Sequence, residues 1–234
     1  MIKAILLDIE GTTTPIDFVH KTLFPFSKER IGDFVRKNFS QINEEVSALE
    51  TEYAVDTSYS DNFDKTSPES VAKYLRHLID VDRKSIPLKS LQGKIWEQGY
   101  ESGALKSLVY DDVPLAFERW KSQGKTIAIY SSGSVLAQKL LFRYTDHGDL
   151  TPNISAYFDT NIGKKQENDS YKKIAEQLDL DANEILFISD VAEELDAAKA
   201  SGLETALIVR GTDANVGDHH PVIKDFGELD DEII

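Results

Sequence analysis

The chain has 234 residues, enough for one large domain or for a core domain with a smaller second one. Its 41% hydrophobic and 29% charged residues are typical of a globular protein. The formal net charge of −15 argues against a nucleic-acid-binding protein, which needs clustered positive charge. The absence of cysteine excludes disulfides, thiolate metal sites and a cysteine nucleophile.

The start of the chain predicts no signal peptide, because Met1 is followed at once by the first predicted strand. No apolar run approaches the roughly 18 residues that a membrane span needs. We therefore expect a cytoplasmic protein that binds neither membranes nor nucleic acids. We also expect it to be a monomer whose partner is a small molecule.

The first predicted element is an apolar strand at residues 4–9, which contains one acid, Asp8. A short apolar run fits a buried strand of a parallel sheet. Asp8 stands where the strand ends and the turn of residues 11–15 begins. Ligands of open α/β sheets bind outside the carboxyl ends of the strands, so an acid there can act on a ligand. The alternative is that Asp8 only caps the turn.

Residues 18–103 show helical patterns and almost no strands. The helical stretches are 18–39, 42–53, 67–79 and 88–103, with a polar loop at 57–65. Pro25 predicts a helix pair or a bent helix in the first stretch, and Ser67 followed by Pro68 predicts a helix start. We interpret 18–103 as a helical cap inserted after the first strand and lying above the strand ends.

From residue 104 onwards, predicted helices alternate with strands. The helices are 112–123, with Asp112 as its cap, 134–144, 168–179 and 191–201, and the strands are 125–130, 184–189 and 204–209. This alternation predicts right-handed crossovers and a parallel sheet covered on both faces. The fold class is therefore α/β, a doubly wound parallel-sheet core formed by residues 1–17 and 104–234.

Two further strand ends carry candidate functional residues. The strand at 125–130 is followed by Ser131 and Ser132, whose hydroxyls and backbone N–H groups at a helix start suit a phosphate. The alternative is a serine helix cap. The strand at 184–189 ends at Asp190, and an acid there suits a hard cation such as Mg²⁺. The alternative for this acid, and for Glu193 and Glu194 after it, is a favourable interaction with the helix dipole.

Lys164 and Lys165 follow the short run AYFDTNIG. One of them pointed inwards could hold a phosphate oxygen, and the alternative is two solvated lysines.

In chain order, these sites resemble the motifs of the haloacid dehalogenase superfamily of phosphatases: Asp8-Ile9-Glu10-Gly11-Thr12, then Ser131, Lys165 and Asp190. Five longer segments resemble more closely the enolase-phosphatases of methionine salvage (acireductone synthases): DIEGTTTPIDFV, LQGKIWEQGYESG, IYSSGSVLAQKLLF, YFDTNIGKKQENDSYKKIA and ILFISDVAEELDAA. Most of the superfamily has Asp where this chain has Glu10, and the closer family has Glu. The resemblance fades only within about 35–85.

The resemblance implies a role for each site residue. Asp8 is the nucleophile that forms an aspartyl-phosphate, and Glu10 carries protons. Mg²⁺ is held by Asp8, the backbone carbonyl of Glu10 and Asp190. Lys165, Ser131 and Ser132 bind the phosphoryl oxygens. The implied substrate is 2,3-diketo-5-methylthiopentyl-1-phosphate, which is enolised and dephosphorylated to 1,2-dihydroxy-3-keto-5-methylthiopentene.

Two other function classes share parts of this pattern. A general sugar- or nucleotide-monophosphate phosphatase would share the four sites but not the segments of the insertion. A catalytically inactive binding module would be expected to lose Asp8, Lys165 or Asp190, and all three are present.

Overall fold

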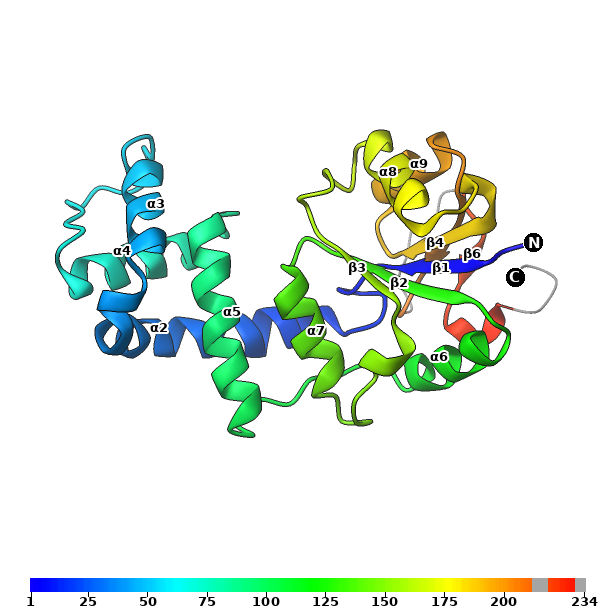
Figure 1. Cartoon of the computed structure of the whole chain (residues 1–234), viewed down its shortest axis with the longest axis horizontal. Coiled ribbons are helices and arrows are strands. Elements are labelled where there is room, and N and C mark those ends of the chain that lie inside the picture. The colour runs from blue at the N-terminus through cyan, green and yellow to red at the C-terminus, as the bar shows by residue number, and fades with distance from the viewer. Residues whose placement is uncertain (212–218, 230–234) are drawn as a thin grey trace. The chain divides into compact units, whose positions relative to one another are not determined.

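The computed structural model describes residues 1–211 and 219–229 (Figure 1). The chain divides into two compact units, the first formed by Met1–Phe18 with Lys106–Ile234 and the second by Val19–Leu105. Within the part of the chain that the structure describes, no helix is long and apolar enough to cross a membrane. Each unit is described here by itself.

The first unit is built on a six-stranded, entirely parallel sheet with the order β3-β2-β1-β4-β5-β6. The strands are β1 (Ala4–Leu7), β2 (Thr126–Tyr130), β3 (Ala156–Phe158), β4 (Ile185–Ser189), β5 (Glu204–Ile208) and β6 (Val222–Ile223). The four side chains of the central strand β1 are all apolar, and all four are fully buried. This strand order reverses direction at β1 and β4, which is where open α/β sheets bind ligands.

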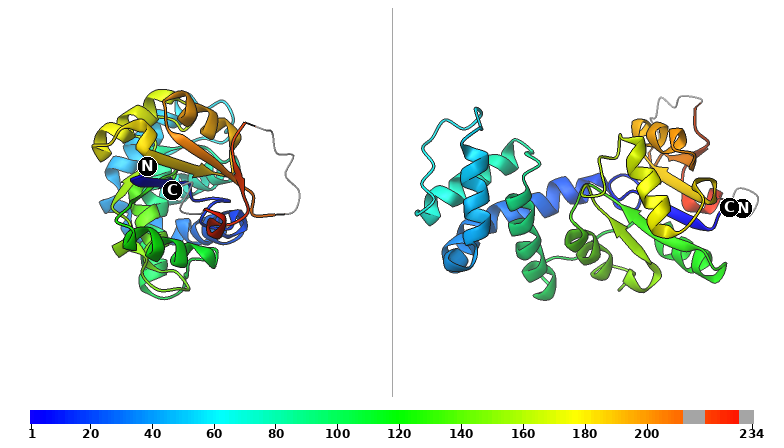
Figure 2. Two further views of the ribbon diagram at one scale, coloured as in Figure 1. Left: turned by 90° about the vertical axis from the view of Figure 1, so that its right-hand side faces the viewer. Right: turned by 45° about the horizontal axis from the view of Figure 1, so that its top comes forward.

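Helices cover both faces of this sheet, as Figures 1 and 2 show. They are α6 (Asp112–Ser122), α7 (Val135–Arg143), α8 (Asn168–Leu178) and α9 (Ala192–Ala200), with a short α1 (Ile16–Phe18) and the 3₁₀ turns η3 (Thr151–Asn153), η4 (Ala182–Glu184) and η5 (Phe226–Glu228). Phe117 and Trp120 of α6 belong to the hydrophobic core on one face, and Tyr171 of α8 and Leu195 of α9 to the core on the other. The predicted doubly wound α/β core is confirmed.

The prediction that Asp112 caps α6 was wrong. Asp111 occupies the cap position, and its side chain makes no capping hydrogen bond. The carboxylate of Asp112 instead accepts hydrogen bonds from Arg210 and from the backbone N–H of Phe226. These partners are about 100 residues away in the sequence, so the local helix-start pattern could not identify them.

The second unit contains helices joined by loops and turns, and no strand is present among its residues 19–105, all of which the structure describes. Its elements are a π-helical turn η1 (Val19–Leu23), α2 (Phe24–Asn38), η2 (Phe39–Gln41), α3 (Asn43–Tyr53), α4 (Pro68–Asp80) and α5 (Ile86–Glu101). Ser67 caps α4 by accepting a hydrogen bond from the backbone N–H of Ser70. Pro25 lies in the first turn of α2. The π-helical turn η1 runs directly into α2, since Leu23 has helical backbone angles, so this stretch is continuous and is not a pair of helices separated at Pro25.

The interior of the second unit is closed by aromatic side chains of α5. The indole N–H of Trp96 donates to the carbonyl of Leu23 over 2.9 Å, and Tyr100 is buried one turn further on.

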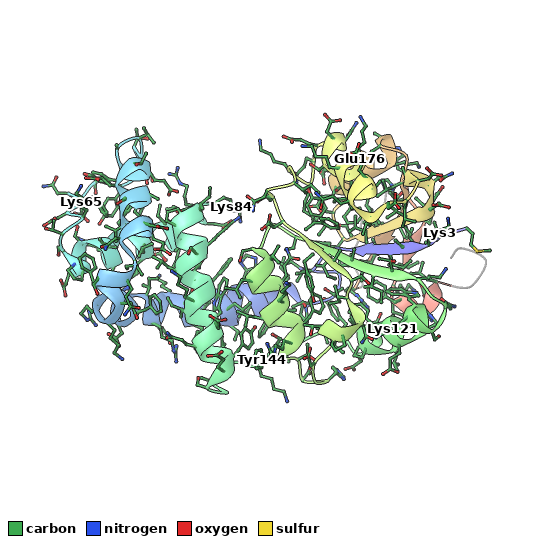
Figure 3. All side chains as sticks on the ribbon, in the orientation of Figure 1. Lys3, Lys65, Lys84, Lys121, Tyr144 and Glu176 are labelled. Atoms are coloured by element: carbon green, nitrogen blue, oxygen red, sulfur yellow. The ribbon has the colours of Figure 1, made fainter. Side chains whose placement is uncertain are left out.

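The surfaces of both units carry solvated ion pairs, such as Lys3 with Glu184 and Lys65 with Glu50, whose lysines are labelled in Figure 3. Exposed pairs of this kind contribute little because solvent screens them, so the apolar cores dominate stability.

Candidate active site

Three of the predicted site residues meet at the carboxyl ends of adjacent strands. The register pairs Leu7 with Ile129 in β2 and with Ile188 in β4. Ser131 and Asp190 each lie two residues beyond those partners, so they flank the end of β1 on its two sides. Asp8 follows Leu7 directly, is buried, and donates its backbone N–H to the carbonyl of Ile188. The sequence pattern therefore placed these strand ends correctly beside one another.

A tight turn follows Asp8 and fixes its direction. The backbone N–H groups of Thr12, Thr13 and Thr14 all donate to the carbonyl of Ile9. Gly11 has a φ of 72°, a conformation that favours glycine. A Cβ at this position would overlap the carboxylate of Asp190. The turn and Asp190 therefore lie in direct contact, and only a residue without a side chain fits between them.

One of the two lysines turns inwards, as predicted. Lys165 is buried, and its ammonium group faces Asp8. Its Nζ lies 2.5 Å from Oδ1 of Asp8 and 2.5 Å from Oε2 of Glu194. Burial alone would lower the pKa of Lys165, but the carboxylates of Asp8 and Glu194 outweigh burial and raise it. Lys165 is therefore a charged ammonium group held between two carboxylates. Lys164 lies at the surface.

Glu194 is a residue of this site that the sequence analysis missed. Its side chain is buried, and its Oε2 accepts a hydrogen bond from the hydroxyl of Ser189 over 3.1 Å. Burial raises the pKa of Glu194, and the nearby charge of Lys165 opposes that rise. The available signal was its place on the buried face of α9, next to Leu195 and four residues before Ala198. Glu193, by contrast, is exposed, as the helix-dipole interpretation expects.

Asp190 follows β4 and reaches solvent. Its backbone N–H donates to Oγ1 of Thr12 over 3.1 Å, which ties the end of β4 to the turn after β1. The packed atoms around the carboxylate and the negative charge of Asp8 raise the pKa of Asp190 to about 6. Two carboxylates therefore repel each other here, an arrangement that a cation would relieve.

Glu10 lies within the turn, partly buried, and its backbone forms a bridge with Thr14. Ser131 is buried after β2, and its Oγ accepts a hydrogen bond from the backbone N–H of Gly133 over 3.1 Å. Ser132 follows it and is partly buried, and Ser134 caps α7. The serine-cap alternative thus applies to Ser134, which leaves Ser131 and Ser132 at the strand end.

The donor set suits a hard divalent cation. Among the described residues, no three His, Cys, Asp or Glu side chains are clustered as a metal site. Mg²⁺ needs no such cluster, because proteins bind it through one or two carboxylates together with substrate phosphate and water. Asp8 and the backbone carbonyl of Glu10, both at the end of β1, together with Asp190 at the end of β4, fit that requirement.

A strand-end aspartate against a buried lysine, beside a second strand-end aspartate, places a carboxylate next to a fixed positive charge. A family model described as haloacid dehalogenase-like hydrolase matches residues 2–202. The chain belongs to this family of hydrolases.

Curated relatives place it more narrowly. The enolase-phosphatase E1 of Leptospira borgpetersenii (strain JB197) is 48% identical over 222 residues, which cover 94% of this chain and 95% of that protein. The enolase-phosphatase E1 of Drosophila willistoni is 46% identical and covers 97% and 96%. Within the hydrolases, this chain is therefore a member of the enolase-phosphatase E1 family, and it is a phosphatase. The predicted family and enzyme class are confirmed.

Solved structures agree with the fold. The crystal structure of the UTR4 protein of Saccharomyces cerevisiae matches with a TM-score of 0.79 and 37% identity, covering 98% of this chain and 100% of that one. A dehalogenase with 16% identity and a TM-score of 0.57 shares the fold alone.

Proposed function

We propose that this protein is a magnesium-dependent enolase-phosphatase that acts on 2,3-diketo-5-methylthiopentyl-1-phosphate in methionine salvage. The observation that supports the proposal best is the contact of Asp8 with the buried Lys165, beside Asp190, in a member of the enolase-phosphatase E1 family. The product is 1,2-dihydroxy-3-keto-5-methylthiopentene, formed by enolisation followed by hydrolysis of the phosphate ester.

Asp8 is the proposed nucleophile. One carboxylate oxygen of Asp8 attacks phosphorus, the bond to the leaving oxygen breaks, and an aspartyl-phosphate forms. Water then cleaves this intermediate and restores the carboxylate. The ammonium group of Lys165 lies 2.5 Å from Oδ1 of Asp8, where it can neutralise phosphoryl oxygens.

Glu10 is the proposed proton carrier. It protonates the leaving oxygen in the first step and takes a proton from the attacking water in the second. The same carboxylate can abstract the carbon-bound proton during enolisation. Its place two residues after the nucleophile, in the turn stabilised by the carbonyl of Ile9, supports this role.

Asp8, the backbone carbonyl of Glu10 and Asp190 are the proposed ligands of Mg²⁺. When bound, the ion supplies positive charge that offsets the repulsion between the carboxylates and the phosphate. This local charge matters because the whole chain, at −15, repels an anionic substrate. Ser131, Ser132 and Lys165 are the proposed phosphate-binding residues. The hydroxyl of Ser131 already accepts one hydrogen bond, so its own hydrogen can be donated to a phosphoryl oxygen.

We further propose that the helical insertion, predicted at residues 18–103, is a cap that recognises the organic part of the substrate. The compact helical unit Val19–Leu105 supports this interpretation, because it is a separate body that can differ without changing the sheet. A monomeric state and a cytoplasmic location remain expectations.

The test is to incubate the purified protein with Mg²⁺ and the diketo phosphate and to follow enol product and inorganic phosphate separately. We expect both products with wild-type protein, and neither after EDTA removes the metal. Sugar and nucleotide monophosphates serve as competing substrates. Faster hydrolysis of those esters than of the diketo phosphate would favour a general phosphatase, and full turnover in EDTA would exclude the proposed mechanism.

A further inference from the structure

Arg210 reaches from the end of β5 to the turn that follows Asp8. Its Nε and Nη2 donate to the backbone carbonyl of Thr12 over 3.0 and 2.7 Å, and its Nη1 donates to Oδ2 of Asp112 over 2.7 Å. The side chain is one-tenth exposed. All the groups involved belong to the first unit. The planar guanidinium thus uses three of its donors to join the catalytic turn to the start of α6.

The same guanidinium is fixed by aromatic rings. Its carbon lies 4.3 Å from the ring centre of Tyr110 and 4.7 Å from that of Phe226. Oδ2 of Asp112 also accepts the backbone N–H of Phe226 over 2.7 Å. These contacts hold the plane of the side chain, so the two donors that meet the carbonyl of Thr12 are oriented before any ligand binds.

Thr12 connects Arg210 to the candidate active site. Its carbonyl accepts from Arg210, while its Oγ1 accepts the backbone N–H of Asp190 over 3.1 Å. Thr12 is fully buried, and it follows Gly11, which lies against the carboxylate of Asp190. A shift of Thr12 would therefore move Glu10 and Asp190 together, and these are two of the residues that the proposed reaction needs.

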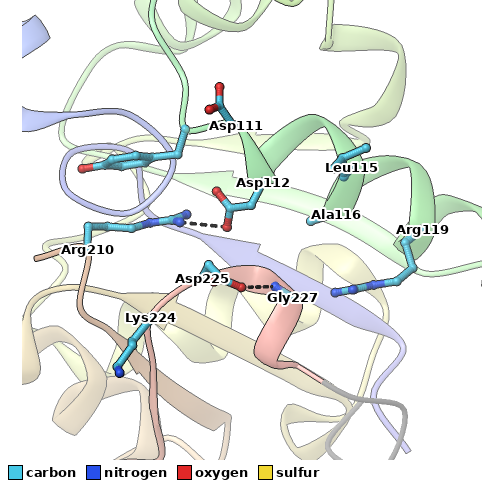
Figure 4. Close-up of a pocket in the computed structure, with 10 residues that line it drawn as sticks. Asp111, Asp112, Leu115, Ala116, Arg119, Arg210, Lys224, Asp225 and Gly227 are labelled. Carbon is cyan, nitrogen blue, oxygen red and sulfur yellow. Dashed lines mark hydrogen bonds and ion pairs between the residues drawn. The ribbon is translucent and has the colours of Figure 1, made fainter.

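The alternative is that Arg210 only stabilises the fold. Replacing a buried ion pair by apolar groups of similar volume often leaves the stability of a protein unchanged or raises it. Stability alone therefore does not require an arginine at this position. An open cavity of about 470 Å³ also lies beside it, lined by Arg119, Asp112 and Asp225 among others (Figure 4).

We propose that Arg210 is a positioning residue of the enolase-phosphatase: by holding the carbonyl of Thr12, it fixes the turn that carries Glu10 and contacts Asp190. This inference rests on the proposed function for its substrate. It rests on the geometry of the turn for everything else.

The test compares Arg210→Met, Arg210→Lys and Arg119→Met. Arg119 lines the same cavity and donates to the carbonyl of Phe226 over 2.6 Å, but it is bonded to the C-terminal segment rather than to the catalytic turn. For each variant we would measure kcat and KM for phosphate release, together with the melting temperature Tm. Circular dichroism would confirm folding.

We expect Arg210→Met to lower kcat by about 10–100-fold, as is usual for residues that orient catalytic groups, while KM changes by less than about threefold. Arg210→Lys keeps one donor but loses the fork, so its kcat should fall between those of wild type and Arg210→Met. Arg119→Met removes a hydrogen bond to the carbonyl of Phe226 but no contact with the catalytic turn, so it should leave kcat near the wild-type value whatever its effect on Tm.

Equal kcat in Arg210→Met and Arg119→Met would overturn the proposal, and so would a loss in Arg210→Met that appears in KM alone. If Arg210→Met does not fold, the kcat of Arg210→Lys is compared with that of Arg119→Met, and equal values would again overturn the proposal. The assay is run on the diketo phosphate and on a simple aryl phosphate. Failure of wild type on the first substrate alone would refute the proposed substrate, while the variants on the second would still test Arg210.

Discussion

Replacing Asp190 by asparagine should stabilise the metal-free protein while it removes activity. Burial and the charge of Asp8 raise the pKa of this carboxyl to about 6, from 3.8. For a fully buried carboxyl, a pKa shift of that size would destabilise the folded protein by about 3 kcal/mol at neutral pH. Because the side chain reaches solvent, screening reduces the expected value to about 1 kcal/mol.

The sign of the pH dependence follows from proton binding. Between about pH 4 and pH 6 the folded protein binds more protons at Asp190 than the unfolded chain does, so the stability of the wild type falls as the pH rises through that window. Asp190→Asn removes the titrating group, so its stability does not fall in this way as the pH rises. The two proteins should therefore differ little at pH 4, and at pH 7 the variant should be the more stable.

The assay is thermal unfolding in EDTA from pH 4 to pH 8. For a chain of this size, about 1 kcal/mol corresponds to a rise in Tm of about 2–4 °C. Glu193→Gln is the matched control, since it removes an exposed acid from the same segment and should give no such rise. Saturating Mg²⁺ should stabilise the wild type more than Asp190→Asn. A variant less stable than wild type at pH 7, or a difference independent of pH, would refute the reasoning.

Three further substitutions test the roles in the site. Asp8→Asn should fold and release no phosphate, because an amide is a poor nucleophile; substantial phosphate release would exclude Asp8. Glu10→Gln should slow both enolisation and phosphate release by about 10²–10⁴-fold, since the side chain can no longer carry a proton. An unchanged rate of phosphate release would show that Glu10 is not the donor. Glu194→Gln should lower kcat about 10–100-fold by leaving Lys165 to Asp8 alone, and a wild-type kcat would contradict that view.

The parts of the fold that the sequence predicted correctly are those encoded by local pattern. The strands β1, β2, β4 and β5 are short, mostly apolar runs, and their alternation with helices along the chain favours a parallel sheet. The two-residue strand β6 was not predicted, since Val222–Ile223 is too short to show a period and is recognised only through its pairing with β5.

The residues of the site also divide into those that local pattern identifies and those that it does not. Asp8, Ser131 and Asp190 could be found because each follows a buried strand, and strand ends of a parallel sheet converge. Glu194 and Arg210 could not be found in this way. Glu194 is part of the site through its contact with Lys165, and Arg210 through its contact with Thr12, and both partners are distant in the sequence. A buried acid among helix N-terminal acids has the same local signature as its exposed neighbours.

The position of β1 also has a consequence for synthesis of the protein. β1 is made first and lies in the middle of the sheet, yet its neighbour β2 begins at Thr126, where Ala4 pairs with it. At roughly 5–20 residues per second, the ribosome needs on the order of 6–25 s to make the intervening chain. Throughout that interval the apolar segment Ala4–Leu7 has no strand to pair with, and the helical unit Val19–Leu105 is completed before β2 is made. The nascent chain therefore carries an apolar segment that has no partner strand, and local helix formation in the insertion precedes the long-range pairing that creates the active site.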